Sequence, residues 1–163
     1  MRSVMLMVLA AAVACGPSSA EIKTAKTTMY SGPAAEMFKL MIDTTAETYK
    51  VADAHQVGEL DDYELLTAPQ WYTPEGGRES AGTGDFVNLV DGSIQLSLIV
   101  QLSRRDNGKL LVTVTPKTFQ DVSGSPKPRE LQPDDPNLPG WVQGRADSLQ
   151  LEIHKRLQKY AVQ

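Results

Sequence analysis

The strongest constraint on the fold of this chain is an alternating stretch, SIQLSLIVQL, over residues 93–102. Alternation with a period of two places one apolar set of side chains on one face of a strand. Asp106-Asn107-Gly108 follows as a tight-turn signature, and the alternation resumes from Lys109 to Thr115. The pattern predicts a central antiparallel hairpin, whose second strand runs on past Pro116 to Val122 if a bulge accommodates the proline. Its buried face is predicted to hold Ile94, Leu96, Leu98, Val100, Leu102, Leu110, Val112 and Val114.

Two further segments have helical periodicity. Ser31 is a suitable N-cap and Pro33 suits a first turn, so a helix is predicted to begin there. A second helix is predicted to begin at Trp141 and to close the domain. The predicted inner face of the first contains Ala34, Met37, Phe38, Met41, Thr45 and Tyr49, and that of the second Val142, Ala146, Leu149, Ile153, Leu157 and Tyr160. We interpret the Met and aromatic stripe as core, with a ligand groove as the alternative.

The other predicted strands are Ile22–Tyr30, Tyr49–Ala54 and Tyr63–Tyr72. Pro69 interrupts the last of them, which is typical of a sheet edge or a bulge. Together with the hairpin and the helices, these give the order β-α-β-β-β-β-α. The predicted class is α+β, a single two-layer domain over residues 22–163 with an antiparallel sheet of four to five strands and two helices.

Two long loops interrupt this pattern. Residues 75–85, EGGRESAGTGD, contain four glycines and predict a mobile loop. Residues 123–140 contain five prolines and predict an extended surface connection.

The amino terminus has the organisation of an export signal. Arg2 is followed by an unbroken apolar run from Val4 to Val13. Ten helical residues span about 15 Å, half of a bilayer core of about 30 Å, so the run is short for a membrane span. Residues 1–14 are therefore predicted to be a signal peptide and are left out of the fold.

The signal ends at Ala12-Val13-Ala14, directly before Cys15, which is the single cysteine of the chain. This stretch resembles the lipobox of bacterial lipoproteins. The resemblance implies that diacylglycerol is attached to the Cys15 thiol, that the signal is removed, and that a fatty acid such as palmitate acylates the new amino terminus. The alternative is an ordinary secretory signal cleaved after Ala14 or Ala20, which would leave Cys15 as a free thiol.

Residues 15–21 are predicted to be a lipidated, flexible tether because they are mostly small. The residue after the cysteine is Gly16, and by resemblance to enterobacterial lipoproteins this favours the outer membrane, with the domain facing the periplasm. The expected partner of the anchor is thus the membrane itself, through lipid on Cys15.

The order of predicted elements resembles the helix-grip domains of the C-component lipoprotein of the outer-membrane β-barrel assembly machinery. The LPS-assembly lipoprotein is similar in having two helices on a sheet. YSGPAAEMF at residues 30–38 and PGWVQGRADSLQLEIHKRL at residues 139–157 look like segments of uncharacterised proteobacterial lipoproteins. The resemblance implies a small envelope lipoprotein domain and supplies no catalytic or ligand-binding residues.

Composition narrows the range of partners. The chain has 163 residues, with 16 basic and 20 acidic side chains. Without Arg2 the mature chain keeps 15 of the basic residues and all the acidic ones, a net charge of −5. An acidic chain with no basic stripe is not expected to bind nucleic acid.

No motif predicts catalysis, a metal or a cofactor. His55 and His154 lack a second ligand at metal-binding spacing. The acidic pairs Asp61-Asp62 and Asp134-Asp135 lie in predicted loops, where solvated carboxylates are expected. Phosphate-binding glycine motifs and G-x-S-x-G are absent from the sequence. We therefore expect a non-enzyme without a metal or cofactor.

The remaining candidate site is QWYTPEGGRE, residues 70–79. It places Trp71, Tyr72 and Arg78 beside the glycine-rich loop, and Trp141 follows the proline-rich connection. Aromatic residues and Arg are enriched at interfaces, so these four residues form the predicted interaction surface, with core plugging as the alternative for the tryptophans. The predicted function is a non-catalytic, periplasm-facing lipoprotein that binds a protein or another envelope component. The alternatives are a helix-grip domain for a small apolar ligand and an enzyme.

Overall fold

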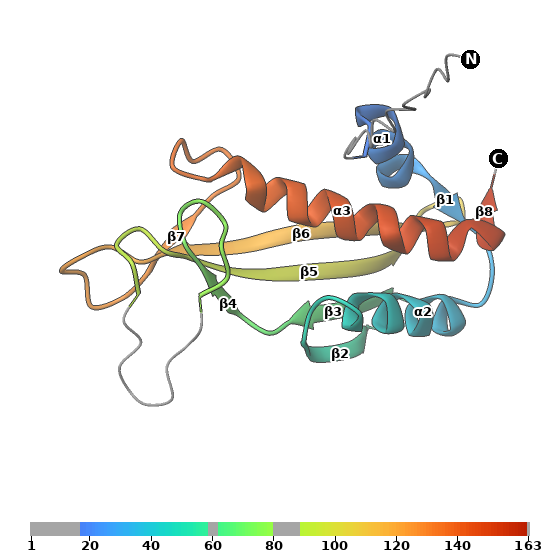
Figure 1. Ribbon diagram of the computed structural model, residues 1–163. Helices are drawn as coiled ribbons and strands as arrows, with labels where there is room; N and C mark the ends of the chain where they lie inside the picture. The colour runs from blue at the N-terminus through green and yellow to red at the C-terminus, as the bar shows by residue number, and fades with distance from the viewer. Residues whose placement is uncertain (1–16, 59–61, 80–88, 163) are drawn as a thin grey trace, which may run out of the picture.

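The protein is an α+β domain in which helices cover one face of an antiparallel sheet, as seen in a computed structural model that describes residues 17–58, 62–79 and 89–162 (Figure 1). The predicted class is confirmed, but the described sheet has eight strands instead of four to five. Its main path runs β2-β3-β5-β6-β1-β8, with β4 paired to β5 and β7 paired to β6. The strands are β1 (Met29–Tyr30), β2 (Val51–Val57), β3 (Asp62–Thr67), β4 (Gln70–Tyr72), β5 (Ile94–Arg104), β6 (Leu110–Gln120), β7 (Arg129–Leu131) and β8 (Ala161–Val162).

The predicted central hairpin is confirmed as β5 and β6. Pairing is continuous from Ile94 opposite Gln120 to Arg104 opposite Leu110. Gly108 closes the turn with φ +75°, a conformation that glycine adopts readily. The inner face is apolar as predicted, and Leu98 is fully buried together with Val100, Leu102 and Val112.

Pro116 lies within β6 without a bulge, opposite Leu98. The backbone N–H of Leu98 donates to the Thr67 hydroxyl at 2.8 Å, on the β3 side, so it points away from β6. In an antiparallel ladder Pro116 must then direct its ring nitrogen away from β5. On that outer side β1 pairs with residues 110–111 and β7 with residues 118–120, so among the described strands residues 112–117 have no partner there. The missing N–H of Pro116 therefore removes no ladder hydrogen bond.

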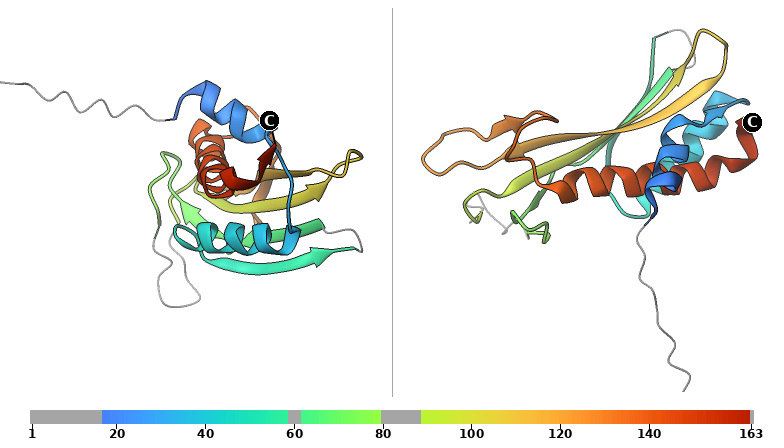
Figure 2. Two further views of the ribbon diagram at one scale, coloured as in Figure 1. Left: turned by 90° about the vertical axis from the view of Figure 1, so that its right-hand side faces the viewer. Right: turned by 90° about the horizontal axis from the view of Figure 1, so that it is seen from above.

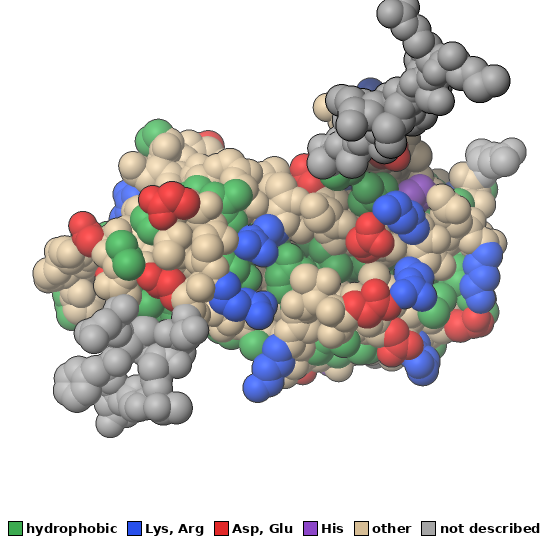
Figure 3. Space-filling view, viewed as in Figure 1, with side chains coloured by type: hydrophobic (Ala, Val, Ile, Leu, Met, Phe, Trp, Pro, Cys, Tyr) green, Lys and Arg blue, Asp and Glu red, His purple; other side chains and the backbone are tan. Residues whose placement is uncertain are grey.

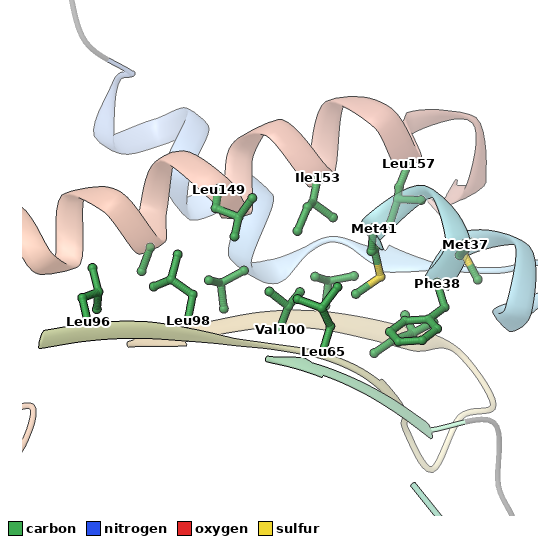
Figure 4. Close-up of a cluster of buried hydrophobic side chains, with 14 of the residues drawn as sticks. Met37, Phe38, Met41, Leu65, Leu96, Leu98, Val100, Leu149, Ile153 and Leu157 are labelled. Carbon is green, nitrogen blue, oxygen red and sulfur yellow. The ribbon is translucent and has the colours of Figure 1, made fainter. Parts of the chain in front are cut away.

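Two helices, α2 (Ala34–Ala46) and α3 (Gly140–Leu157), cover the inner face of the sheet (Figure 2). Their predicted apolar faces are confirmed: Met37, Met41 and Ile153 are fully buried. Figure 4 shows Met41 and Ile153 directed toward Leu65 and Val100, between the helices and the strands. The N-cap of α2 is Pro33 rather than the predicted Ser31, and the cap has no side-chain hydrogen bond.

The prediction of a strand over Ile22–Tyr30 is wrong. Residues Ser19–Thr27 form helix α1, and only Met29 and Tyr30 remain in the sheet, as β1. The cause is a capping box, in which the Ser18 hydroxyl accepts from the Glu21 N–H at 3.2 Å and the Glu21 carboxylate accepts from the Ser18 N–H at 2.8 Å. This reciprocal pair satisfies two N–H groups at the start of the helix, those of Ser18 and Glu21, which outweighs the weak strand propensity of the segment.

The predicted flexible tether is correspondingly too long. Ser19, Ala20 and Glu21 belong to α1, so the ordered fold begins before residue 22. Ala25 is fully buried, and its carbonyl accepts from the side chain of Gln150 on α3 at 3.0 Å. Lys26 also pairs with Asp147 of α3 at 2.6 Å. Helix α1 is thus docked on α3, beside the β1 edge of the sheet.

The remaining differences concern strand ends. β2 spans Val51–Val57 rather than Tyr49–Ala54, because Tyr49 still belongs to the turn that follows α2. The predicted strand Tyr63–Tyr72 is divided at Ala68-Pro69 into β3 and β4, as expected from the proline. The proline-rich connection contains β7, and a short 3-10 turn at Gln158–Tyr160 leads from α3 to β8.

Candidate functional site

The four residues of the predicted interaction surface divide between the two faces of the sheet. Trp71 pairs with Gln95, so it lies on the outer face, and it is half-buried. Tyr72 pairs with Ile94 and points to the inner face, where it is 1% exposed. Tyr72 is therefore a core residue and presents no surface to a partner, which corrects its place in the predicted surface.

The side chain of Arg78 lies on the same, helix-covered face of the sheet as that of Tyr72. A backbone bridge pairs Tyr72 with Arg78, and opposed residues in an antiparallel bridge direct their side chains to the same face. Arg78 is exposed there. The structure thus separates Arg78 from Trp71 and places it near Tyr49, in the turn that follows α2.

Trp141, the second residue of α3, packs against Tyr72. Their ring centroids are 5.3 Å apart at an angle of 53°. Arg145 lies one helical turn further along, and its guanidinium is 4.4 Å from the centroid of the Tyr72 ring and 5.4 Å from that of Trp141. Sequence reasoning overlooked Arg145, although its spacing of four from Trp141 places both residues on one helix face.

The same two α3 residues hold the loop after β4. The indole N–H of Trp141 donates to the carbonyl of Pro74 at 2.9 Å, and Arg145 donates to the carbonyl of Gly76 at 2.9 Å. Gly76 has φ +91°, and a β-carbon added there would lie 3.0 Å from the indole of Trp141. Trp141 is half-buried, so it connects the loop to the core and also reaches the surface.

A surface cleft of about 520 Å³ lies beside this cluster, between the end of α2 and the bend from β3 to β4. Tyr49 and Arg78 are on its walls. Burial raises the pKa of the Tyr49 phenol, while the nearby guanidinium groups of Arg145 and Arg78 act in the opposite direction. The other lining residues are Ala46, Glu47, Thr48, Lys50, Ala68, Pro69 and Gln70.

The rim of this cleft is basic, although the chain is acidic overall. Glu47 is the one carboxylate among the lining residues, and it pairs with Arg156 of α3. Lys50 and Arg78 are exposed, and neither has an ion-pair partner among residues 17–58, 62–79 and 89–162. Figure 3 shows basic side chains on this helical face, beside exposed apolar surface at its centre. The arrangement suits an acidic group presented on an apolar body.

Several of the titratable residues that the sequence singles out have structural partners. His55 is exposed and pairs with Asp53 at 3.0 Å. The Asp62 carboxylate accepts from the backbone N–H of Arg104, and that of Asp135 accepts from Asn137. Within the described part of the chain, no three His, Cys, Asp or Glu side chains gather as metal ligands would. Asp61 lies outside the described residues.

One apolar hollow of about 170 Å³ lies beside the unpaired side of β6, bordered by Val114, Leu131, Pro133 and Leu138. Sites for small organic ligands usually have volumes of about 300–1,000 Å³. The hollow is therefore small for the apolar-ligand alternative.

Cys15 and the glycine-rich part of the loop from residue 80 lie outside the described residues. Among the helices that are described, none combines the length and apolar character needed to cross a bilayer. The sequence is matched by no family model, and neither curated proteins nor solved structures gave a match.

Proposed function

We propose that this protein is a non-catalytic lipoprotein of the bacterial envelope, which faces the periplasm and binds an acidic segment of a partner protein at the cleft beside Arg78. The observation that carries the binding role is a pair of cations, Lys50 and Arg78, on the rim of a cleft in an acidic domain, neither of which has an ion-pair partner among the described residues. Complementary charge of this kind steers a partner and selects its orientation.

The scaffold around the cleft supports this role. Arg145 and Trp141 fix the loop that leads to Arg78 through bonds to the carbonyls of Gly76 and Pro74. A loop that is already held in place loses less conformational entropy when a partner binds. The buried Tyr72 and the half-buried Trp141 thus act as a support for Arg78 rather than as contact residues.

The membrane anchor is supported by the sequence before the fold. The apolar run, the small residues Ala12-Val13-Ala14 and the lone Cys15 have the order of a lipobox. Several acyl chains on one cysteine would hold the domain firmly, since each buried methylene contributes about 0.8 kcal/mol. The outer membrane remains the favoured site because Gly16 follows the cysteine.

The anchor is tested by metabolic labelling with a fatty acid and by membrane fractionation of wild type and Cys15→Ser. Wild type is expected to take up label and to remain in the membrane fraction, whereas Cys15→Ser should take up none and be released. A Cys15→Ser protein that stays with the membrane, beside an unlabelled wild type, would overturn the lipoprotein assignment.

The cleft is tested by a photo-reactive amino acid at Thr48, an exposed lining residue, in living cells. We expect a discrete protein adduct that is lost with Arg78→Glu and retained with Arg105→Glu, a charge reversal at an exposed arginine in the hairpin turn. An adduct that survives Arg78→Glu would show that the basic rim does not bind the partner.

A further inference from the structure

The route from Cys15 into the fold is very short. Pro17 is described, and only Gly16 stands between it and Cys15. Consecutive Cα atoms are 3.8 Å apart, so the Cα atom of Cys15 lies within about 7.6 Å of that of Pro17. Pro17 borders a hollow of about 430 Å³ together with Leu151 and Lys155 of α3. The anchor must therefore leave the domain beside the solvent-facing side of α3.

The helix that follows this short connection is fixed to the domain. The Gln150 side chain that donates to the carbonyl of Ala25 on α1 at 3.0 Å also donates to that of Val112 on β6 at 3.1 Å, and Lys26 pairs with Asp147. β1 enters the sheet directly after α1, at Met29. Helix α1 cannot swing freely about Thr28, because both its buried face and its carboxyl end are attached.

The two edges of the sheet consequently lie at different distances from the anchor. α1 is at the β1–β8 edge, and β2 forms the opposite edge (Figure 2). Four strand intervals separate β2 from β1, a distance of about 19 Å at 4.7–4.9 Å per interval. On the exposed surface of α1, Lys23 has no ion-pair partner among the described residues, whereas Lys26 is paired with Asp147 and the Glu21 carboxylate accepts from Ser18. An exposed lysine is suited to contact with anionic lipid headgroups.

We infer that the docked helix α1 and the short connection to Cys15 orient the domain on the bilayer, with α1 against the lipid headgroups and the β2 edge directed away from the membrane. This inference rests on the proposed lipid anchor at Cys15. It adds that the anchor is not a loose tether, and that α1 is an interaction surface for the membrane.

The test uses the lipidated full chain in vesicles of phosphatidylethanolamine and phosphatidylglycerol that contain a headgroup-nitroxide lipid. Because Cys15 would be blocked by lipid, a bimane fluorophore can be attached to a single new cysteine, Thr27→Cys on α1 or Gln56→Cys on β2. Both positions are exposed. We expect the nitroxide to quench bimane at position 27 at least threefold more strongly than at position 56.

A control variant carries a flexible Gly-Ser insert of about 20 residues between Gly16 and Pro17, with a mean span of about 25 Å. In this variant the quenching at the two positions should become similar. Flotation of the vesicles reports anchoring separately. Protein that does not float overturns the anchor and the orientation with it. If the protein floats but quenching is equal at both positions, the orientation alone is overturned. The same conclusion follows if the insert leaves the difference in quenching between the two positions unchanged.

Discussion

The phenol oxygen of Tyr30 lies 2.8 Å from Nδ1 of His154, although 124 positions separate the two residues. Tyr30 is fully buried in β1, and His154 is on α3. Burial raises the pKa of Tyr30 to about 12 and lowers the pKa of His154. Both shifts favour the neutral pair, in which the phenol donates to an unprotonated Nδ1.

This pair predicts a plateau in the pH dependence of stability. The contribution of Tyr30 is complete below the unfolded pKa of about 10 and is lost as the pH rises through about 12, because the unfolded phenol ionises first. The contribution of His154 is present above its unfolded pKa of about 6.5 and is lost as the pH falls through its lower folded pKa. Thermal melting is therefore expected to be highest between about pH 6.5 and 10.

Tyr30→Phe provides the comparison. It should lower the free energy of unfolding on the plateau by about 1 kcal/mol through loss of the hydrogen bond. It should also make the loss of stability at alkaline pH less steep. Thermal melts of both proteins from acid to alkaline pH measure this. An alkaline decline of equal steepness in the two proteins would contradict the role given to Tyr30.

Leu98→Asp is expected to unfold the domain, because it places an unpaired charge at the fully buried centre of β5, at a cost of several kcal/mol. Thr115→Asp is the matched control, since Thr115 is exposed on the outer face of the adjacent strand. It should change the free energy of unfolding by less than about 0.5 kcal/mol. Urea denaturation followed by circular dichroism compares the two, and similar midpoints would mean that the faces of the sheet are misassigned.

Gly76→Ala is expected to destabilise the protein by about 1–3 kcal/mol more than Gly124→Ala. Both glycines have positive φ, +91° and +81°, so each variant incurs backbone strain. Only at Gly76 would the new methyl group meet the Trp141 indole, at 3.0 Å, whereas the space around Gly124 is open. Thermal melts give the difference between the variants. Equal melting temperatures would show that Trp141 does not hold the loop.

Gln150→Met is expected to loosen α1 selectively. It keeps a long side chain but leaves the carbonyls of Ala25 and Val112 without a buried donor, at a cost of about 1–3 kcal/mol for each unsatisfied group. Hydrogen exchange read by mass spectrometry should show faster exchange in α1 than in wild type, with β5 less affected. Unchanged exchange in α1 would mean that Gln150 does not secure this helix.

The parts of the fold that sequence predicts well are those with long, regular apolar patterns. The hairpin of β5 and β6 and the helices α2 and α3 have inner faces that recur over several turns or strand pairs, so burial alone determines them. The first segment lacks such a pattern. There the outcome depends on Ser18 and Glu21 acting together and on Gln150, which lies 125 positions from Ala25. A capping box is visible in SSAE, but docking against a distant helix is not.

The candidate site was also less predictable, because its contacts join residues that are far apart in the sequence. Trp71, Tyr72 and Arg78 are neighbours in sequence, yet alternation along β4 sends Trp71 and Tyr72 to opposite faces. The partner of Tyr72 is Arg145 of α3, whose spacing from Trp141 places it on the same helix face but does not indicate a contact with Tyr72. Periodicity could have separated the two aromatic residues, whereas the contact with α3 required the tertiary structure.

Pro116 has a consequence for contacts between copies of this chain. Among the strands that the structure describes, none pairs with the outer side of β6 along residues 112–117, and such a side ordinarily recruits a strand from a neighbouring molecule. Pro116 has no N–H to offer there, and Gln150 already occupies the carbonyl of Val112. The gap between β1 and β7 is thereby made a poor template for edge-to-edge aggregation between neighbouring molecules.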